Sequence, residues 1–149
     1  MTSLDQAINA LAIREVRLRN SSLSLADDIE LLELQSLNLE VQAFHGVGKI
    51  KEIRLQEDGQ NWWEYNFFYA AGVRLVQPEI ESSPVVEIQA TLNALYRSSV
   101  ELERFALDAF SEEHVGYHVW PYWREYVQST CARLGITPIR VGLYRVNQK

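Results

Sequence analysis

Apolar and polar residues alternate along much of the first two thirds of the chain, which predicts antiparallel β-strands. In residues 12–25, Val16 and Leu18 alternate with Arg17 and Arg19, as in a strand with one solvated face. The arginines also suit the edge of a sheet, where charge discourages pairing with other chains. We therefore expect an edge strand here.

A second alternation begins at Leu37 and is interrupted at Gly46 and Gly48, after which the apolar positions resume one residue out of step. A bulge or a turn produces such a shift, so residues 37–55 form either one bent strand or two. Residues 26–34, which mix acids with leucine and isoleucine, are compatible with a loop or with a single helical turn.

Asp58 and Gly59 form a dipeptide that takes the positive φ values of tight hairpin turns, so it predicts a hairpin. The following residues 63–75 are apolar at every odd position and predict the most buried strand. Two prolines then break the pattern, because proline has no N–H to donate to a sheet. Residues 86–97 alternate again and predict a strand with a solvated side.

The last third of the chain predicts a long amphipathic helix. Pro121 suits its first turn and Gly135 its end. One face of this helix collects large apolar residues: Trp120, Trp123, Tyr126, Val127, Thr130, Cys131 and Leu134. A shorter helix is expected at residues 4–11, capped by Ser3, and residues 101–110 are compatible with a helix or with a tightening transition. After the long helix, residues 139–146 predict an extended arm.

A run of antiparallel strands followed by one dominant helix is typical of the α+β class, with helices on one face of a sheet. The 149 residues suit one domain, residues 1–149. The aromatic helix face, with Trp120, Tyr126 and Val127, exceeds what one sheet readily covers. We expect these three residues at a subunit interface, and hence a homo-oligomer.

Charge narrows the possible partners. Fourteen basic residues against twenty acidic ones give a net charge of −6, which fits neither a nucleic-acid backbone nor an anionic membrane surface. The first residues contain both acids and bases and no long apolar run, so neither a signal peptide nor membrane insertion is expected. We expect a cytoplasmic protein whose lone cysteine, Cys131, is buried and unreactive.

Catalytic and metal-binding patterns are weak. His114 and His118 have the spacing of helical metal ligands, but Gly116 between them disfavours a helix, and no third ligand is indicated. They are better interpreted as exposed loop histidines. The sequence contains no phosphate-binding loop, dinucleotide fingerprint or serine elbow. We expect no enzymatic activity, no metal and no cofactor.

Aromatic residues are the most prominent feature, and two interpretations stay open for them. Most large aromatics belong to an ordinary core. Some can instead line an apolar groove for extended, non-native polypeptide segments. On the second interpretation, Trp63, Tyr65 and Phe67 of the apolar strand contact such clients.

The segment VWPYWREYVQSTCARLG, followed by ITPIRVGLYRV, resembles the SecB family of export chaperones. In that family an aromatic or aliphatic residue precedes Pro-Tyr-x-Arg-Glu, and the helix ends at an Arg-x-Gly-like stop. The corresponding positions are Trp120, Pro121, Tyr122, Arg124, Glu125, Arg133 and Gly135. Residues 12–25 and 85–97 are similar to the first and last strands of the family.

The resemblance implies a four-stranded antiparallel sheet with a long helix, assembled as a dimer of dimers whose helices lie between sheets. Unfolded clients lie in apolar grooves without ATP or another cofactor. Carried over to this chain, Leu37, Leu39 and Val41 line the groove, and Tyr122 and Trp123 lie near it.

Two departures from the family concern its partner, the SecA motor. The first strand of the export chaperones carries acids that dock on SecA, whereas this chain has the uncharged residues 20–24 there. The chain also ends soon after Leu143, without the second helix and motor-binding tail of the family. Coupling to SecA therefore stays open. Related SecB-like chaperones protect the antitoxin of a toxin–antitoxin pair, so the client is either an unfolded preprotein or an antitoxin.

The working hypothesis is an ATP-independent holdase, a chaperone that binds exposed apolar segments of other proteins. Two alternatives belong to other classes. One is a small-ligand-binding or enzymatic domain in which Trp63, Tyr65 and Phe67 enclose a pocket. The other is a structural subunit whose aromatic surface is covered permanently by a fixed partner.

Overall fold

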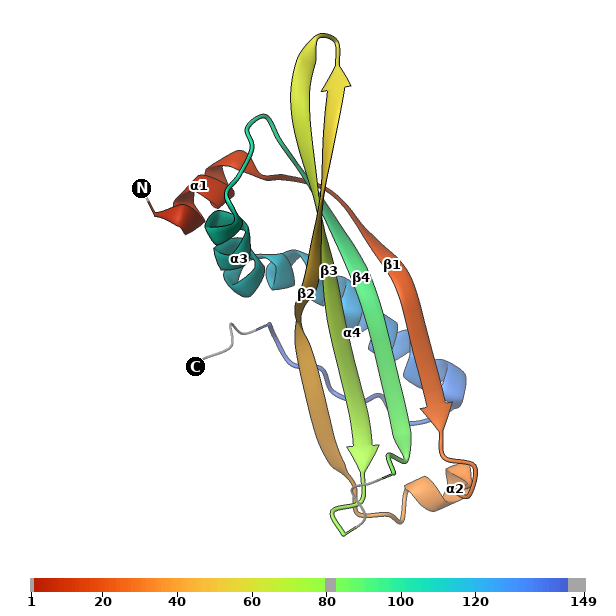
Figure 1. Ribbon diagram of the computed structural model, residues 1–149. Coiled ribbons are helices and arrows are strands. Elements are labelled where there is room, and N and C mark those ends of the chain that lie inside the picture. The colour runs from red at the N-terminus through yellow and green to blue at the C-terminus, as the bar shows by residue number, and fades with distance from the viewer. Residues whose placement is uncertain (1, 80–82, 145–149) are drawn as a thin grey trace.

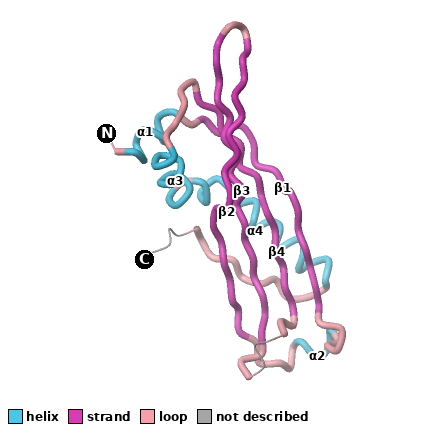
Figure 2. Tube along the Cα trace, in the orientation of Figure 1, coloured by secondary structure: helices cyan, strands magenta, loops and turns pink. Residues whose placement is uncertain are grey.

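A computed structural model describes residues 2–79 and 83–144 and shows a twisted antiparallel sheet with helices behind it (Figure 1). Its four strands are β1 (Ala12–Leu25), β2 (Glu40–Glu57), β3 (Gln60–Val76) and β4 (Val86–Ser98), in the spatial order β1-β4-β3-β2. The helices are α1 (Ser3–Ala10), α2 (Leu31–Leu34), α3 (Arg104–Glu113) and α4 (Val115–Leu134) (Figure 2). The predicted α+β class is confirmed.

The strand predictions hold closely. β1 has the predicted bounds and lies at one edge of the sheet, as its arginines indicated. β2 is a single strand whose register against β3 shifts between Val47 and Lys49. The extra residue is Gly48, so a bulge explains why the apolar positions change parity.

The β2–β3 hairpin projects beyond the rest of the sheet (Figure 1). Asp58 and Gly59 have φ values of 51° and 78°, the positive values expected of its turn. β4 pairs with β3 only from Trp63 onward, so the hairpin tip is a two-stranded ribbon. Its neighbours in the sheet end before the tip is reached.

The core lies between the helices and one face of the sheet. Alternate residues of β3 and β4 point to this helix-covered face, where Phe67 and Tyr96 meet edge to face with ring centroids 5.2 Å apart. Phe110 of α3 completes the aromatic group, at 5.7 Å from Phe67 and 5.1 Å from Tyr96. The Leu102 N–H donates to the Tyr65 hydroxyl at 2.9 Å, so even the polar atom of that buried ring is satisfied.

The long helix begins earlier than predicted. α4 starts at Val115, which places Pro121 inside the helix and makes Gly116 helical. A glycine suits this position of the helix because the Tyr144 ring lies directly against it. A Cβ here would come within 2.2 Å of the ring atoms. Pro121 and Tyr117, the residue whose carbonyl loses its helical donor, both lie on the exposed side of the helix. Gly135 ends the helix with φ 76°, as predicted.

The shorter helices also differ slightly from their predicted bounds. α1 is capped by Thr2 rather than Ser3, because the Thr2 hydroxyl accepts from the Asp5 N–H while the Asp5 carboxylate accepts from the Thr2 N–H. α3 begins at Arg104, later than expected. The segment 26–34 contains only the short helix α2.

The segment that follows α4 has no regular secondary structure and runs back alongside the helix. The Trp120 indole N–H donates to the Gly142 carbonyl at 2.7 Å, and the Tyr117 and Tyr144 rings meet with centroids 4.8 Å apart. These contacts hold the predicted arm, as far as Tyr144, against α4. Its last predicted residues lie outside the described part of the chain.

Candidate functional site

Residues 31–41, which we call the leucine segment, carry exposed aliphatic side chains on the surface. Leu32 of α2 is 91% exposed, and Leu31 and Val41 are 43% and 55% exposed. Leu37 and Leu39 are half-buried and pack against the core. Some side chains of the segment therefore pack against the core while others present an apolar surface to solvent, an arrangement suited to contact with another apolar chain.

Strand β1 carries a second row of exposed aliphatic residues. Ile13, Leu18 and Leu23 are each 41–49% exposed and lie opposite β4 residues whose side chains face the helices. Among the described strands, β1 has a partner only on the β4 side. Its other backbone edge can accept an additional strand, and the aliphatic row would lie beside that strand.

Several predicted client-binding residues do have surface positions. Leu37, Leu39 and Val41 belong to the leucine segment described above. Tyr122 lies on the outer side of α4 with 52% of its surface exposed. Leu31 and Leu32 were not predicted from the sequence as binding residues. Two adjacent leucines among acids in a short turn do indicate an exposed apolar surface.

Other predicted client-binding residues belong to the core instead. Tyr65 and Phe67 are 0% exposed and Trp123 is 2% exposed, because α3 and α4 pack over the sheet face that carries the two strand residues. Trp63 is half-buried against the same core. In this arrangement Tyr65, Phe67 and Trp123 are not available to a client. Tyr65 and Phe67 also do not enclose the pocket that the small-ligand alternative requires.

Other residues of the same chain largely cover the three residues that were expected at a subunit interface. Val127 is 0% exposed, and Tyr126 is half-buried and stacks on Trp123 with ring centroids 6.2 Å apart. Trp120 is half-buried by the C-terminal arm and by His45, 5.1 Å away between ring centroids. The arm thus takes part of the aromatic surface that we assigned to a second subunit.

Comparison with known proteins gives a structural match and no sequence match. No family model and no curated protein matches the chain. Among solved structures, the chain is similar to the Mycobacterium tuberculosis Rv1957 SecB-like chaperone in complex with a ChAD peptide from the Rv1956 HigA1 antitoxin. The TM-score is 0.68 at 14% sequence identity, and the match covers 98% of this chain and 99% of the other.

The chain has the SecB-like fold. This agrees with the resemblance seen in residues 119–135 and 136–146, although most other positions differ. At such low identity the likeness establishes the arrangement of strands and helices. What the surfaces of this chain bind has to be argued from its own residues.

Two partly buried hydrogen bonds join tyrosine and histidine side chains at the edge of the core. The Tyr69 hydroxyl lies 2.8 Å from His45 Nδ1, and the Tyr96 hydroxyl lies 2.7 Å from His118 Nδ1. Burial lowers the pKa of His45, and burial together with the nearby His114 lowers the pKa of His118. Burial also raises the pKa of both tyrosines. Both pairs are therefore neutral near physiological pH.

These contacts correct the interpretation of His118 as an exposed loop residue. It lies on α4, half-buried, with its ring engaged by Tyr96. Residues 2–79 and 83–144 contain no group of three or more histidine, cysteine or acidic side chains able to hold a metal ion. Cys131 is fully buried on α4, as predicted. Within the same residues, no helix is both long and apolar enough to cross a bilayer.

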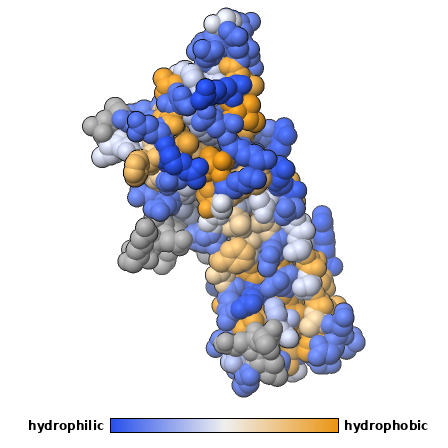
Figure 3. Space-filling view, viewed as in Figure 1, coloured by the Kyte–Doolittle hydropathy of each residue, from blue (hydrophilic) through white to orange (hydrophobic). Residues whose placement is uncertain are grey.

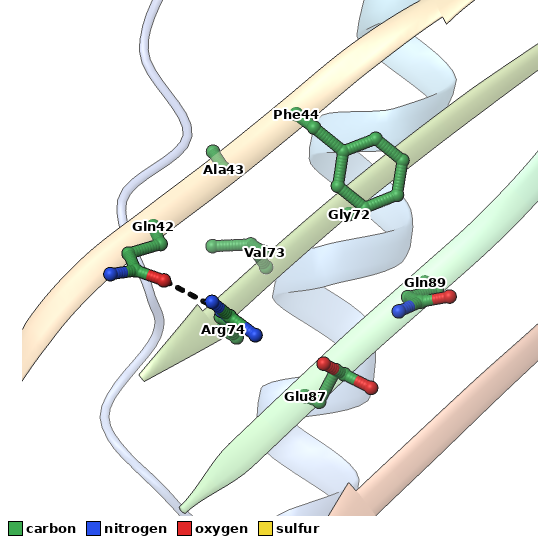
Figure 4. Close-up of a pocket in the computed structure, with 8 residues that line it drawn as sticks. All are labelled: Gln42, Ala43, Phe44, Gly72, Val73, Arg74, Glu87 and Gln89. Atoms are coloured by element: carbon green, nitrogen blue, oxygen red, sulfur yellow. Dashed lines mark hydrogen bonds between the residues drawn. The ribbon is translucent and has the colours of Figure 1, made fainter. Parts of the chain in front are cut away.

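The sheet face turned away from the helices has a different character. Figure 3 looks onto this face, which we call the open face, and shows hydrophilic and hydrophobic residues interspersed. A shallow depression lies where the Phe44 ring covers Gly72, close enough that a Cβ at Gly72 would meet the ring at 2.2 Å (Figure 4). Beside it the Arg74 Nε donates to Gln42 Oε1 at 2.7 Å. Polar groups therefore frame the exposed ring.

Proposed function

We propose that this chain is a chaperone that binds extended, non-native segments of other polypeptides and delays their aggregation. The observation that carries the proposal is the exposed aliphatic surface of the leucine segment, anchored on a SecB-like fold. The Rv1957 protein of the same fold was solved with a bound antitoxin peptide, which supports a polypeptide as ligand. An unfolded preprotein or an antitoxin, met in the cytoplasm, fits this role.

The physical basis of binding is burial of apolar area. Covering one exposed leucine or valine side chain contributes about 1.5–3 kcal/mol before the cost of ordering the client. Leu31, Leu32 and Val41 offer such contacts without a fixed pattern of hydrogen-bonding groups. The site then tolerates many client sequences, and no nucleotide is needed because no step of the cycle requires hydrolysis.

We further propose that the working form is a homo-oligomer. The unpaired edge of β1, with Ile13, Leu18 and Leu23 beside it, fits a second copy of the same strand better than water. Several copies would present several leucine segments, and a long client bound at two of them dissociates more slowly. Native mass spectrometry of the full chain tests this: a monomer at micromolar concentration would contradict it.

The function is tested by diluting a urea-unfolded model protein into buffer and following aggregation by light scattering. The wild-type chain, without nucleotide, is expected to suppress scattering at stoichiometric ratios. The Leu32→Asp, Val41→Asp double variant is expected to lose most of this effect, because two carboxylates replace apolar contact area. Both positions are exposed, so the fold should persist.

A matched control adds the same charge to the same segment at polar positions. The Gln35→Asp, Asn38→Asp double variant changes two exposed residues and leaves the aliphatic side chains in place. It is expected to suppress aggregation like the wild type. Equal loss in both double variants would show that charge, not apolar contact, matters, and no suppression by the wild type at any ratio would remove the proposal.

A further inference from the structure

An aromatic ring on the open face of the sheet is surrounded by positive charge. The Phe68 ring of β3 lies 4.9 Å from the Arg19 guanidinium carbon, 5.3 Å from Lys49 Nζ and 5.4 Å from Lys51 Nζ, each measured to the ring centroid. These residues come from β1, β2 and β3, and the pairing register of the sheet brings them together. We call them the Phe68 patch.

The charges of the Phe68 patch are not neutralised by the chain itself. Two other cations of the sheet do have carboxylate partners: Arg97 contacts Glu57 and Glu64, and Arg54 contacts Glu52 and Glu101. Within residues 2–79 and 83–144, neither Arg19 nor the two lysines of the patch forms an ion pair. Three like charges therefore gather on a protein whose net charge is −6.

An anionic ligand would complete this exposed cluster of cations. The attraction of each cation to the ring face offsets part of the mutual repulsion, and Arg19 also donates to Asn93 Oδ1 at 3.1 Å. A hollow beside the patch is lined by Arg17, Arg19, Asn20, Asn66, Asn93 and Leu95, among others. At its floor, Asn93 is 9% exposed and its Nδ2 atom has no hydrogen-bond acceptor within the described residues.

The surroundings favour a short acidic polypeptide over a nucleic acid. Glu15 lies in the same hollow, paired with Arg17, and Glu64 lies on the same face, paired with Arg97, so the unpaired positive charge there is confined to a short region. Such a region matches a few carboxylates, whereas a nucleic-acid backbone needs a longer basic track. Phe44 of β2, 51% exposed, pairs with Gly72, which lies four residues beyond Phe68 on β3, an offset of about 13 Å along the strand. It offers contact for an apolar side chain of the same ligand.

We infer that the Phe68 patch binds an acidic segment of a partner protein, with carboxylates on Arg19, Lys49 and Lys51 and apolar side chains along Phe68 and Phe44. The site lies on the face opposite the helices, away from the helix-side surface to which Val41 of the leucine segment belongs. It therefore does not depend on the proposed chaperone function.

The binding test uses a fluorescently labelled peptide that alternates glutamate and leucine, and the same peptide with glutamine for glutamate. Fluorescence anisotropy is expected to show binding of the acidic peptide, weakening as salt is raised, and at least about tenfold weaker binding of the glutamine peptide. This comparison needs only the wild-type chain. Equal binding of the two peptides would overturn the inference.

The patch itself is tested with the Lys49→Gln, Lys51→Gln double variant. Loss of two exposed contacts to carboxylates is expected to weaken binding about tenfold. The control, Arg124→Gln with Arg133→Gln, removes the same charge from exposed positions of α4 and should leave affinity within about twofold. Circular dichroism checks that both variants are folded. Equal weakening in both would contradict the assignment.

Two further outcomes would also overturn the inference. Oligouridylate that binds more tightly than the acidic peptide, with the same loss in the lysine variant, would make the patch a nucleic-acid site. Salt-sensitive self-association of the wild type that disappears in the lysine variant would make it a contact between copies. Retained suppression of aggregation by the lysine variant is expected in either case, because the leucine segment is unchanged.

Discussion

At the scale of single residues, burial rather than aromatic character decides what a ring does in this protein. Phe67 is 0% exposed and contacts Tyr96 and Phe110, whereas Phe105 on α3 is 79% exposed. The Phe67→Ala variant is expected to lose about 3–5 kcal/mol of unfolding free energy, and Phe105→Ala about 0.5 kcal/mol or less. Urea denaturation measures both, and similar losses would contradict the core described above.

The two tyrosine–histidine pairs predict a pH dependence of stability. The pKa values of His45 and His118 are lowered in the folded protein from the ordinary 6.5, chiefly by burial. The unfolded chain therefore binds more protons just below that value, so the free energy of unfolding falls as pH drops from about 7 to about 5. The histidine contribution is fully present above 6.5.

The measurement is urea denaturation at both pH values, for the wild type and for the His45→Gln, His118→Gln double variant. The variant can no longer take up protons at these positions, so its stability should change less over this range. Carboxylates titrate mainly at lower pH and affect both proteins alike. A slope in the variant as steep as in the wild type would exclude the two histidines as its source.

The individual site residues show where sequence reasoning stops. Alternation in β3 correctly groups Tyr65 and Phe67 on one face, but it does not say which face the helices cover. The structure places that face under α3 and α4, so the two rings are core residues. The Phe68 patch could not be predicted from the sequence either, because Arg19 and Lys49 are brought to the same ring only by strand pairing.

At the scale of elements, local chemistry predicted most of the fold. The parity change around Gly48 marks a true bulge, and the hairpin turn forms at Asp58 and Gly59. The predicted start of α4 was wrong for a specific reason. Glycine usually disfavours a helix, but Gly116 leaves room for the Tyr144 ring of the C-terminal arm, a contact between distant parts of the chain that the local sequence does not reveal.

The β2–β3 turn gives a test at this scale. Gly59 has a φ of 78°, where a Cβ is strained, although no neighbouring atom would block it. The Gly59→Ala variant should therefore lose about 1 kcal/mol of unfolding free energy through backbone strain alone. Asp58→Gly, which relieves the strain of the φ of 51° at position 58 itself, should cost less. Thermal or urea denaturation that ranks the two variants in the opposite order would contradict the turn geometry.

At the scale of the whole molecule, the two faces of the sheet offer different chemistry. The helix side carries the core and, at its margin, the aliphatic surfaces of the leucine segment and β1. The open face carries charge, small residues and two exposed or half-buried phenylalanine rings. This chain thus presents one exposed aliphatic surface and a second, positively charged surface.

The most direct test of the central claim is site-specific photocrosslinking to an unfolded client. A benzoylphenylalanine is placed at Leu32 or Val41 of the leucine segment, and at Gln60 on the exposed hairpin tip as a control. We predict that a urea-unfolded client crosslinks at positions 32 and 41, that it does so weakly at position 60, and that the folded client does not. Equal crosslinking at all three positions, or none at 32 and 41, would contradict the account.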